Sequence, residues 1–238
     1  MTVSDPPQAL PTIVSREEWE AARAALLLEE KALTRQRDRV SAARRRLPMV
    51  EITTSYTFES EDGPRTLLDL FDGRSQLIVQ HFMFHPDWAE GCSGCSLLAD
   101  HIPPLSHLHA RDTSYVLVSR ASLDKLLSFR ARMGWQVPWV SSGNTTFNQD
   151  FRTTVNDQED HAISTFLRDG DRVFLTWDTR NRGTETFASI FSLLDATAYG
   201  RQEEWEDSPE GWPQTPTFGW LRLHDRYEEI PVSSSCCH

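Results

Sequence analysis

The pattern of apolar and polar positions predicts one long amphipathic helix near the start of the chain. Residues 15–47 contain neither glycine nor proline, and an apolar residue recurs at every seventh position: Trp19, Leu26, Leu33, Val40 and Leu47. This spacing puts the five side chains along one face of a helix about 45 Å long. Ser15 and Glu18 have the residue types and spacing of a capping box that would begin it. Such a helix either lies across the core or forms an arm for homodimerisation, and the sequence leaves both open.

The pattern after this helix predicts alternating strands and helices. A β-ribbon and a helical turn, within residues 50–71, precede an apolar run, Leu77–Phe84, that is typical of a central strand covered on both sides. A second strand (115–118) and a helix (122–129) follow, and Asp169-Gly170 then joins two strands of a hairpin (163–167 and 172–177). Residues 184–194 have the spacing of a core-facing helix. Parallel elements followed by an antiparallel hairpin predict a thioredoxin-like α/β fold with a central mixed sheet in three layers.

Composition shifts divide the chain into four parts. A proline-rich segment, residues 1–14, is expected to be flexible, and the long helix occupies 15–47. The thioredoxin-like domain is expected over 48–200, with a polar, irregular insert at 141–162 beside the site. An irregular C-terminal extension, 201–238, carries several tryptophans and ends in Cys236-Cys237-His238.

The net charge and the cysteine content restrict the classes of partner and the cellular compartment that we expect. A net charge of -11 over 238 residues argues against nucleic acid as a partner, because phosphate binding calls for a basic face. The chain has no apolar run long enough to span a membrane and no secretory signal, so no membrane partner is expected. Four cysteines do not make a disulfide scaffold, and we expect a cytoplasmic protein.

The strongest chemical signal is a Cys-x-x-Cys pair, Cys92 and Cys95, between the predicted central strand and an apolar helical segment that begins at Ser96. The N-terminus of a helix stabilises a thiolate, here on Cys92, and Cys95 one turn later can resolve a mixed disulfide. Thiol–disulfide exchange with a thiol, disulfide or other small-molecule substrate is therefore predicted, without an organic cofactor. The alternatives are a copper or zinc site built from Cys92 and Cys95 with histidines, and a redox-silent dimeric binding domain.

Several side chains near this pair are candidates for supporting roles. His81 is either a core histidine or a neighbour that tunes Cys92, and His85 and Trp88 lie in the loop that leads to the thiols. His161 precedes the hairpin; His81, His85 and His161 are the histidines for the metal alternative. Two tryptophans, Trp135 and Trp139, flank Pro138 and would either wall a groove or pack in the core. Cys236 and Cys237 form a vicinal dithiol that could shuttle electrons to the pair.

The chain resembles the DUF899 family of thioredoxin-like proteins over nearly its whole length. The segments that carry the resemblance are Arg44–Pro48, Leu70–Val79, His81–Phe84, Gly91–Ser96, Val118–Ala121, Arg132–Trp135, Pro138–Ser142 and Phe147–Phe151. The family implies the fold and no settled activity. The layout is also similar to the peroxiredoxin branch of the thioredoxin superfamily.

Two departures accompany this resemblance. Gly91 and Gly94 stand where thioredoxins have Trp and Pro, and the Thr three residues before the first Cys of peroxiredoxins is absent. A thioredoxin-like course would place Pro138 opposite the thiols. A peroxiredoxin-like course, which we favour, would place His161-Ala162 there.

Overall fold

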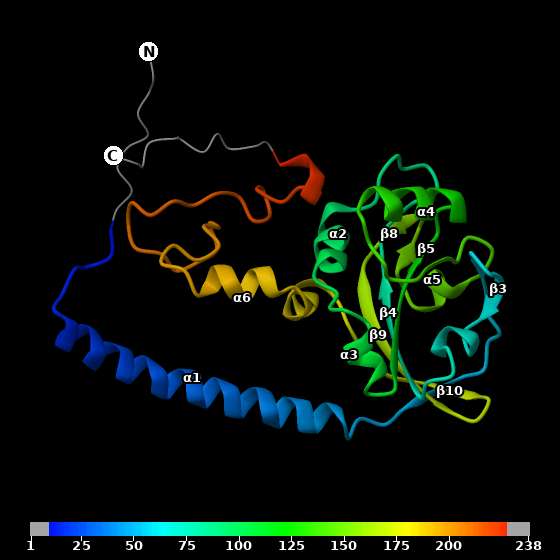
Figure 1. Cartoon of the computed structure of the whole chain (residues 1–238), viewed down its shortest axis with the longest axis horizontal. Helices are drawn as coiled ribbons and strands as arrows, with labels where there is room; N and C mark the ends of the chain where they lie inside the picture. The colour runs from blue at the N-terminus through cyan, green and yellow to red at the C-terminus, as the bar shows by residue number, and fades with distance from the viewer. Residues whose placement is uncertain (1–9, 228–238) are drawn as a thin grey trace, which may run out of the picture.

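The computed structural model describes residues 10–227, and an eight-stranded mixed sheet forms its centre (Figure 1). The strand order is β1-β10-β9-β4-β5-β6-β2-β3. Three parallel neighbours, β4 (Gln76–His81), β5 (Thr113–Ser119) and β6 (Trp139–Ser141), lie beside the antiparallel hairpin of β9 (Ala162–Asp169) and β10 (Arg172–Thr179). The edge strands are β1 (Val50–Ile52) and β3 (Gly63–Thr66), and β2 (Thr57–Ser60) lies between β6 and β3. A separate pair comprises β7 (Thr154–Val155) and β8 (Gln158–Glu159).

Helices cover both faces of the sheet, which gives the expected three layers. The helices α2 (Ser93–Asp100), α3 (Ser106–His109) and α4 (Leu123–Arg132) pack on one face. The short helices η1 (Asp69–Phe71) and α5 (Phe147–Asp150) pack on the other. Each face has its own buried apolar cluster, and every residue of β5 is buried because this strand lies between the two. The connection β4-α2-β5-α4, followed by the β9-β10 hairpin on the other side of β4, is the thioredoxin-like connectivity that the sequence predicts.

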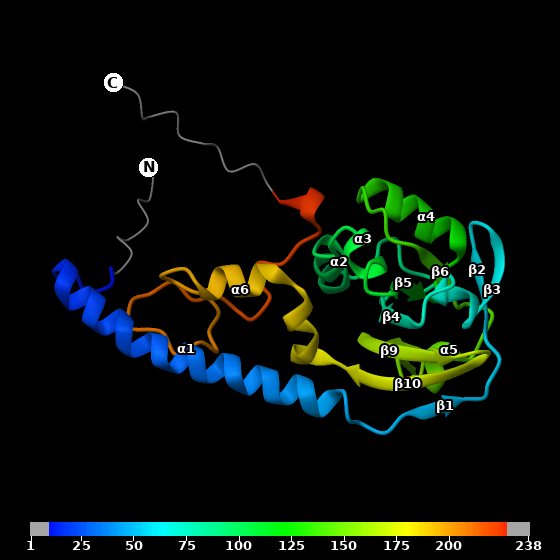
Figure 2. The ribbon, with the colours of Figure 1, turned by 60° about the horizontal axis from the view of Figure 1, so that its bottom comes forward.

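The long N-terminal helix forms, but it does not lie across the core. α1 (Arg16–Arg44) begins with the predicted capping box: Glu18 N–H donates to the Ser15 hydroxyl at 3.2 Å, and Ser15 N–H donates to the Glu18 carboxylate at 3.0 Å. None of its residues is buried, and the view in Figure 2 shows it running away from the sheet. The core-crossing alternative is therefore wrong. The Arg44 guanidinium above the Trp177 ring, 4.3 Å from the centroid, joins its end to β10.

The single helix predicted over 184–194 is instead two short elements. The 3-10 helix η2 (Asn181–Phe187) and α6 (Ser189–Asp195) are separated by Ala188, whose backbone is extended (φ -108°, ψ 107°). This break turns Phe191 against Leu98 of α2 and leaves Phe187 half-exposed, so α6 packs on α2 rather than on the sheet. The expectation of a continuous core-facing helix is therefore corrected.

The extension that follows is mostly irregular, as predicted, and its described part, residues 201–227, holds one short 3-10 helix, η3 (His224–Arg226). Trp220 packs on the cluster of Leu98 and Phe191. Cys236 and Cys237 lie outside the described residues. Within residues 10–227, no helix has the length and apolar character to cross a bilayer.

Candidate functional site

Cys92 and Cys95 lie at the N-terminus of α2, just beyond the end of β4. Cys92 is the N-cap residue of α2, and Cys95 is buried in its first turn. The backbone of Met83 holds both residues: Cys92 N–H donates to the Met83 carbonyl at 3.1 Å, and Met83 N–H donates to Cys95 Sγ at 3.4 Å. Both cysteines are free thiols. The junction between β4 and α2, which the sequence predicts, therefore brings the two sulfurs to the same site.

The pKa values of the two thiols are shifted in opposite directions. A hydrogen bond from the Cys95 thiol is the largest influence on Cys92; burial opposes it, and the backbone N–H groups of Cys95 and Gly94 assist it, so that the pKa of Cys92 falls to about 6. The same hydrogen bond, together with burial, raises the pKa of Cys95 well above its ordinary value. The hydrogen bond from the Cys95 thiol thus lowers the pKa of Cys92 more than the N-terminus of α2 does. The sequence predicts the helix N-terminus as the cause. Near neutral pH, Cys92 is the thiolate and Cys95 the thiol.

A buried polar chain fixes the first turn of α2 to the sheet. The Gln80 amide donates to the Cys95 carbonyl at 2.9 Å, and the Tyr115 hydroxyl donates to the Gln80 oxygen at 3.0 Å. Burial raises the pKa of Tyr115, which therefore stays a neutral donor. Each of these buried polar groups has its partner, so the cysteine pair is held in one orientation.

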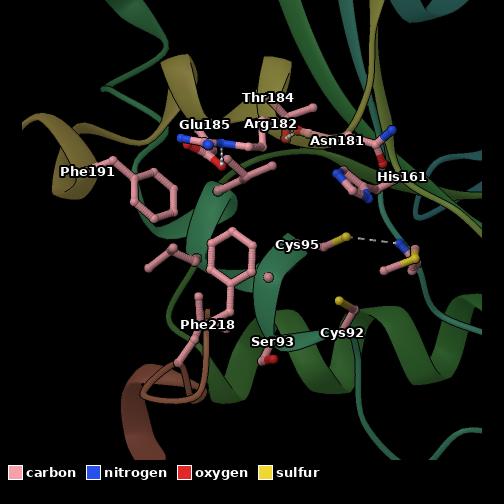
Figure 3. A pocket seen from close by; sticks show the side chains of 15 residues that line it. Cys92, Ser93, Cys95, His161, Asn181, Arg182, Thr184, Glu185, Phe191 and Phe218 are labelled. Atoms are coloured by element: carbon pink, nitrogen blue, oxygen red, sulfur yellow. Dashed lines mark hydrogen bonds and ion pairs between the residues drawn. The ribbon is translucent and has the colours of Figure 1, made fainter. Parts of the chain in front are cut away.

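The sulfurs open onto a cavity of about 380 Å³ between α2, η2, α6 and the C-terminal extension (Figure 3). Apolar side chains form most of its wall: Met83, Leu97, Leu98, Phe191, Phe218 and Leu221. Arg182 and Glu185 also line it and form an ion pair at 3.1 Å. Glu185 is paired a second time by Arg201, at 2.7 Å. Glu185 therefore has two arginine partners, and the other polar side chains of the wall are uncharged serine, asparagine and threonine and the His161 ring.

His161 is the one histidine among the predicted site residues that lines the cavity with the thiols. It directly precedes β9, which pairs antiparallel with β4 in a register that sets Ala162 opposite His81. Asp160 lies next to the ring, with 3.5 Å between its oxygen and His161 Nδ1, and is itself paired with Arg180 at 3.3 Å. His161, and not Pro138, therefore shares the cavity with the thiols, which agrees with the peroxiredoxin-like course at His161.

His81 lies on the opposite face of the sheet from the cysteine pair. Side chains alternate along β4, so Gln80 faces the Cys95 side while His81 stacks on Phe147, with ring centroids 5.3 Å apart. His81 Nε2 and the Ser164 hydroxyl are 2.9 Å apart, and burial lowers the pKa of His81 to about 3. His81 is therefore a neutral core histidine. The insert at 141–162 supplies its neighbour Phe147 through α5 and so covers the far face, while its last part brings His161 to the site.

His85 and Trp88 belong to the loop that delivers the thiols but do not line the cavity. His85 Nε2 lies 3.2 Å from Asp157, and its Nδ1 accepts the Asp87 N–H at 3.1 Å. Trp88 is half-exposed, and its carbonyl accepts a hydrogen bond from Lys125 at 3.2 Å. Both residues anchor the loop to its surroundings.

Trp135, Pro138 and Trp139 do not wall a groove beside the thiols. Trp139 is buried in the aromatic cluster under α4, with its ring centroid 4.6 Å from that of Phe82. The Trp135 indole donates to Asp100 at 2.7 Å, at the far end of α2. Pro138 precedes β6, and residues 10–227 contain no cis peptide bond. Trp139 therefore packs in the core, and Trp135 lines a separate hollow with Leu97 and Trp220, away from the thiols.

The five candidate metal ligands do not converge. Cys92, Cys95 and His161 share the cavity, whereas His81 and His85 point elsewhere. In the part of the chain that the structure describes, no group of three or more His, Cys, Asp or Glu side chains has the arrangement of a metal site.

Sequence reasoning missed the residues that close the cavity from the C-terminal side. Phe218 and Leu221 come from the extension, more than 120 positions after the thiols, with no local pattern to mark them. Their position depends on Glu203, a fully buried carboxylate that accepts hydrogen bonds from Phe218 N–H, Trp220 Nε1 and Trp205 Nε1 at 2.8, 2.8 and 2.6 Å. Burial raises the pKa of Glu203, but these donors outweigh it and lower the pKa overall, so the carboxylate stays charged.

The connectivity and the place of the cysteine pair define a thioredoxin-fold protein with two thiols at the start of the helix after its first central strand. The chain belongs to the family described as "Bacterial protein of unknown function (DUF899)", whose model matches residues 8–227. This confirms the resemblance seen in the sequence. Among curated proteins, none matches the chain.

Solved structures with detectable similarity include peroxiredoxins. Peroxiredoxin Q of Xanthomonas campestris is 13% identical with a TM-score of 0.45, over 62% of this chain and 97% of that chain. Peroxidoxin BcpB of Mycobacterium tuberculosis is 17% identical with a TM-score of 0.45, over the same shares. A 2-Cys peroxiredoxin of Plasmodium vivax is 13% identical with a TM-score of 0.40, over 60% and 93%.

Proposed function

We propose that this protein is a thiol–disulfide oxidoreductase that works through Cys92 and Cys95. The observation that carries the proposal is the placement of both sulfurs on one cavity, with Cys92 at the N-cap of α2 and Cys95 buried behind it. Their opposite acidities support an attacking thiolate at Cys92 and a resolving thiol at Cys95.

The reaction proceeds in two exchanges. The Cys92 thiolate attacks one sulfur of a substrate disulfide; a Cys92–substrate disulfide forms, the substrate S–S bond breaks, and the first substrate thiolate leaves and takes a proton from water. Cys95 then loses its proton, and its sulfur attacks Cys92 Sγ. The second substrate thiolate leaves, and Cys92 and Cys95 end as a disulfide. Two electrons have passed from the protein to the substrate, and a dithiol reductant reverses the change.

His161 is the proposed acceptor of the Cys95 proton. Figure 3 shows its ring and the Cys95 side chain on the same side of the cavity. A buried thiol whose pKa is raised needs a base within the site, because water reaches it poorly. Asp160 beside the ring would stabilise the imidazolium.

The test uses bis(hydroxyethyl) disulfide as substrate and mass spectrometry as readout. The wild-type chain should release two thiols per molecule, Cys95→Ser should stop as a mixed disulfide on Cys92, and Cys92→Ser should not react. The double variant Cys236→Ser/Cys237→Ser is the control and should behave as wild type. Exchange that persists at full rate in Cys92→Ser would refute the proposal.

A further inference from the structure

The cavity beside the thiols has the size of a small-molecule site. Residues of η2, α6 and the extension line it together with the N-terminal part of α2, and its volume of about 380 Å³ is within the ~300–1,000 Å³ of such sites. A small disulfide therefore fits beside the attacking sulfur.

The wall is mostly apolar and offers no carboxylate without a partner. Arg182 and Arg201 both pair with Glu185, and Arg201 pairs again with Asp195 at 2.7 Å, so the carboxylate has no free cation-binding role. Leucine, phenylalanine and methionine side chains form most of the remaining surface, beside the polar side chains of Ser93, Asn181, Thr184 and His161. An apolar arm loses no hydrogen bonds against the apolar side chains, whereas a positively charged arm would lose its hydration without a partner.

Phe218 is the most unusual member of this wall. Its backbone is left-handed (φ 57°), a conformation that is strained for a bulky residue, and the Glu203 carboxylate holds it there through the Phe218 N–H. Phe218 is nevertheless 41% exposed. Its ring centroid lies 6.1 Å from that of Phe191. The fold thus maintains an aromatic surface that its own side chains leave partly uncovered.

We infer that the substrate is a low-molecular-weight disulfide with an uncharged, apolar arm, which lies against Phe218, Phe191 and Leu98 while Cys92 attacks its sulfur. This inference rests on the proposed exchange activity. It adds a substrate class that neither the cysteine pair nor the fold specifies.

A series of symmetric disulfides with hydroxyethyl, hydroxybutyl and hydroxyhexyl arms tests the inference, because chain length changes while the reacting sulfurs stay similar. Each methylene that the cavity buries should raise kcat/KM up to about fourfold, so the hydroxybutyl compound should exceed the hydroxyethyl one by up to about sixteenfold when the two additional methylenes of one arm are buried. Phe218→Ala should flatten this preference, because it should lower kcat/KM more for the hydroxyhexyl compound than for the hydroxyethyl one. Phe187→Ala is the matched control, since Phe187 is 38% exposed nearby but does not line the cavity.

The outcomes separate the two proposals. Equal rates along the series in wild type, or faster reduction of insulin than of the hydroxyhexyl compound, would overturn the substrate class and leave the exchange activity standing. A lack of exchange with every disulfide would overturn the activity itself.

A second inference concerns α1 and rests on different observations. The apolar row of the helix is exposed along its length, with Trp19 at 50%, Leu33 at 61% and Val40 at 46%. An isolated surface helix with such a row lacks the packing that stabilises most helices in proteins. The row calls for a partner that presents a matching apolar face.

The charges of α1 identify that partner as a second copy. Residues 16–30 carry five acidic and two basic side chains, whereas residues 31–44 carry five basic and one acidic. Two copies placed antiparallel set each acidic half against a basic half and bring Leu26 of one row beside Leu33 of the other. A parallel pair would place like charges together. We propose that α1 forms an antiparallel homodimer through this row.

Mass measurement of the full chain in solution tests the dimer. Leu33→Glu introduces one charge per chain into the row and should weaken dimerisation about 100-fold, since each of two burials is worth at least about tenfold. Leu28→Glu is the control: Leu28 is 66% exposed on the opposite side of the helix and should leave the dimer intact. A monomeric wild type, or equal loss in both variants, would overturn the dimer. Raising NaCl from about 0.05 to about 0.5 M should weaken an antiparallel pair; unchanged or tighter association would overturn the orientation.

Discussion

Gly94 occupies the second position of α2, directly between the two thiols in sequence. Its N–H is among the groups that lower the pKa of Cys92, and a Cβ at this position would meet only Cys92 Sγ, at 3.8 Å. The residue therefore contributes an N–H donor rather than space. Gly91 differs, because a Cβ there would lie 2.6 Å from the Phe82 ring. At Gly91 the glycine is required by close packing.

This difference leads to a prediction for Gly94→Pro, which removes the N–H, against Gly94→Ala, which keeps it. The thiolate of Cys92 should appear as pH rises through about 6 in wild type and in Gly94→Ala. In Gly94→Pro the midpoint should move to higher pH, because the thiolate has lost a donor while the neutral thiol has not. The rate of alkylation of Cys92 against pH, with mass identification of the residue, measures both midpoints. Identical midpoints in the two variants would contradict the assigned role.

His161 carries a second prediction at this scale. His161→Gln should leave the alkylation rate of Cys92 unchanged but slow the second exchange about 10²-fold or more, the usual contribution of a general base. The mixed disulfide on Cys92 should then accumulate transiently in stopped reactions. If both exchanges slow equally, or neither does, His161 is not the proton acceptor of Cys95.

Among the elements, the C-terminal extension has a buried carboxylate at its centre. Glu203 accepts hydrogen bonds from three donors, and through Phe218 it sets one side of the cavity. Glu203→Ala should therefore reduce the free energy of unfolding by about 3 kcal/mol, given ~1 kcal/mol for each of the hydrogen bonds lost. Glu203→Gln, which keeps an acceptor oxygen, should lose less. Urea unfolding measures both, and an unchanged midpoint in Glu203→Ala would show that the extension is held by other contacts.

The sequence predicts elements well where one local pattern decides them, and poorly where distant segments compete. A continuous apolar run was enough for β4, the turn residues Asp169-Gly170 for the β9-β10 hairpin, and the spacing of Ser15 and Glu18 for the capping box of α1. The break at Ala188 was not predictable, because the helical spacing of apolar residues continues through it. Only packing against Leu98, which is distant in sequence, stabilises the change of direction. Likewise, alternation along β4 alone assigns His81 to the face opposite Gln80, but which face holds the thiols depends on how α2 folds back.

For the whole molecule, the same reasoning explains which site residues sequence analysis recovered. Cys92 and Cys95 are adjacent in sequence and defined by a strand-to-helix junction, so their chemistry was accessible. His161 lies in the site because of the register in which β9 pairs with β4. The sequence indicates this position only after the peroxiredoxin-like path of the chain is chosen over the thioredoxin-like one. Phe218 and Glu203 belong to an irregular segment, whose position is set by side-chain hydrogen bonds rather than by periodicity.

The central claim is that Cys92 and Cys95 form one reversible redox pair. Full-length protein, oxidised with one equivalent of bis(hydroxyethyl) disulfide and digested without reduction, should yield a peptide containing both residues that has lost two hydrogen atoms and regains them with dithiothreitol. Finding both thiols free after oxidation, or Cys92 joined instead to Cys236 or Cys237, would contradict it.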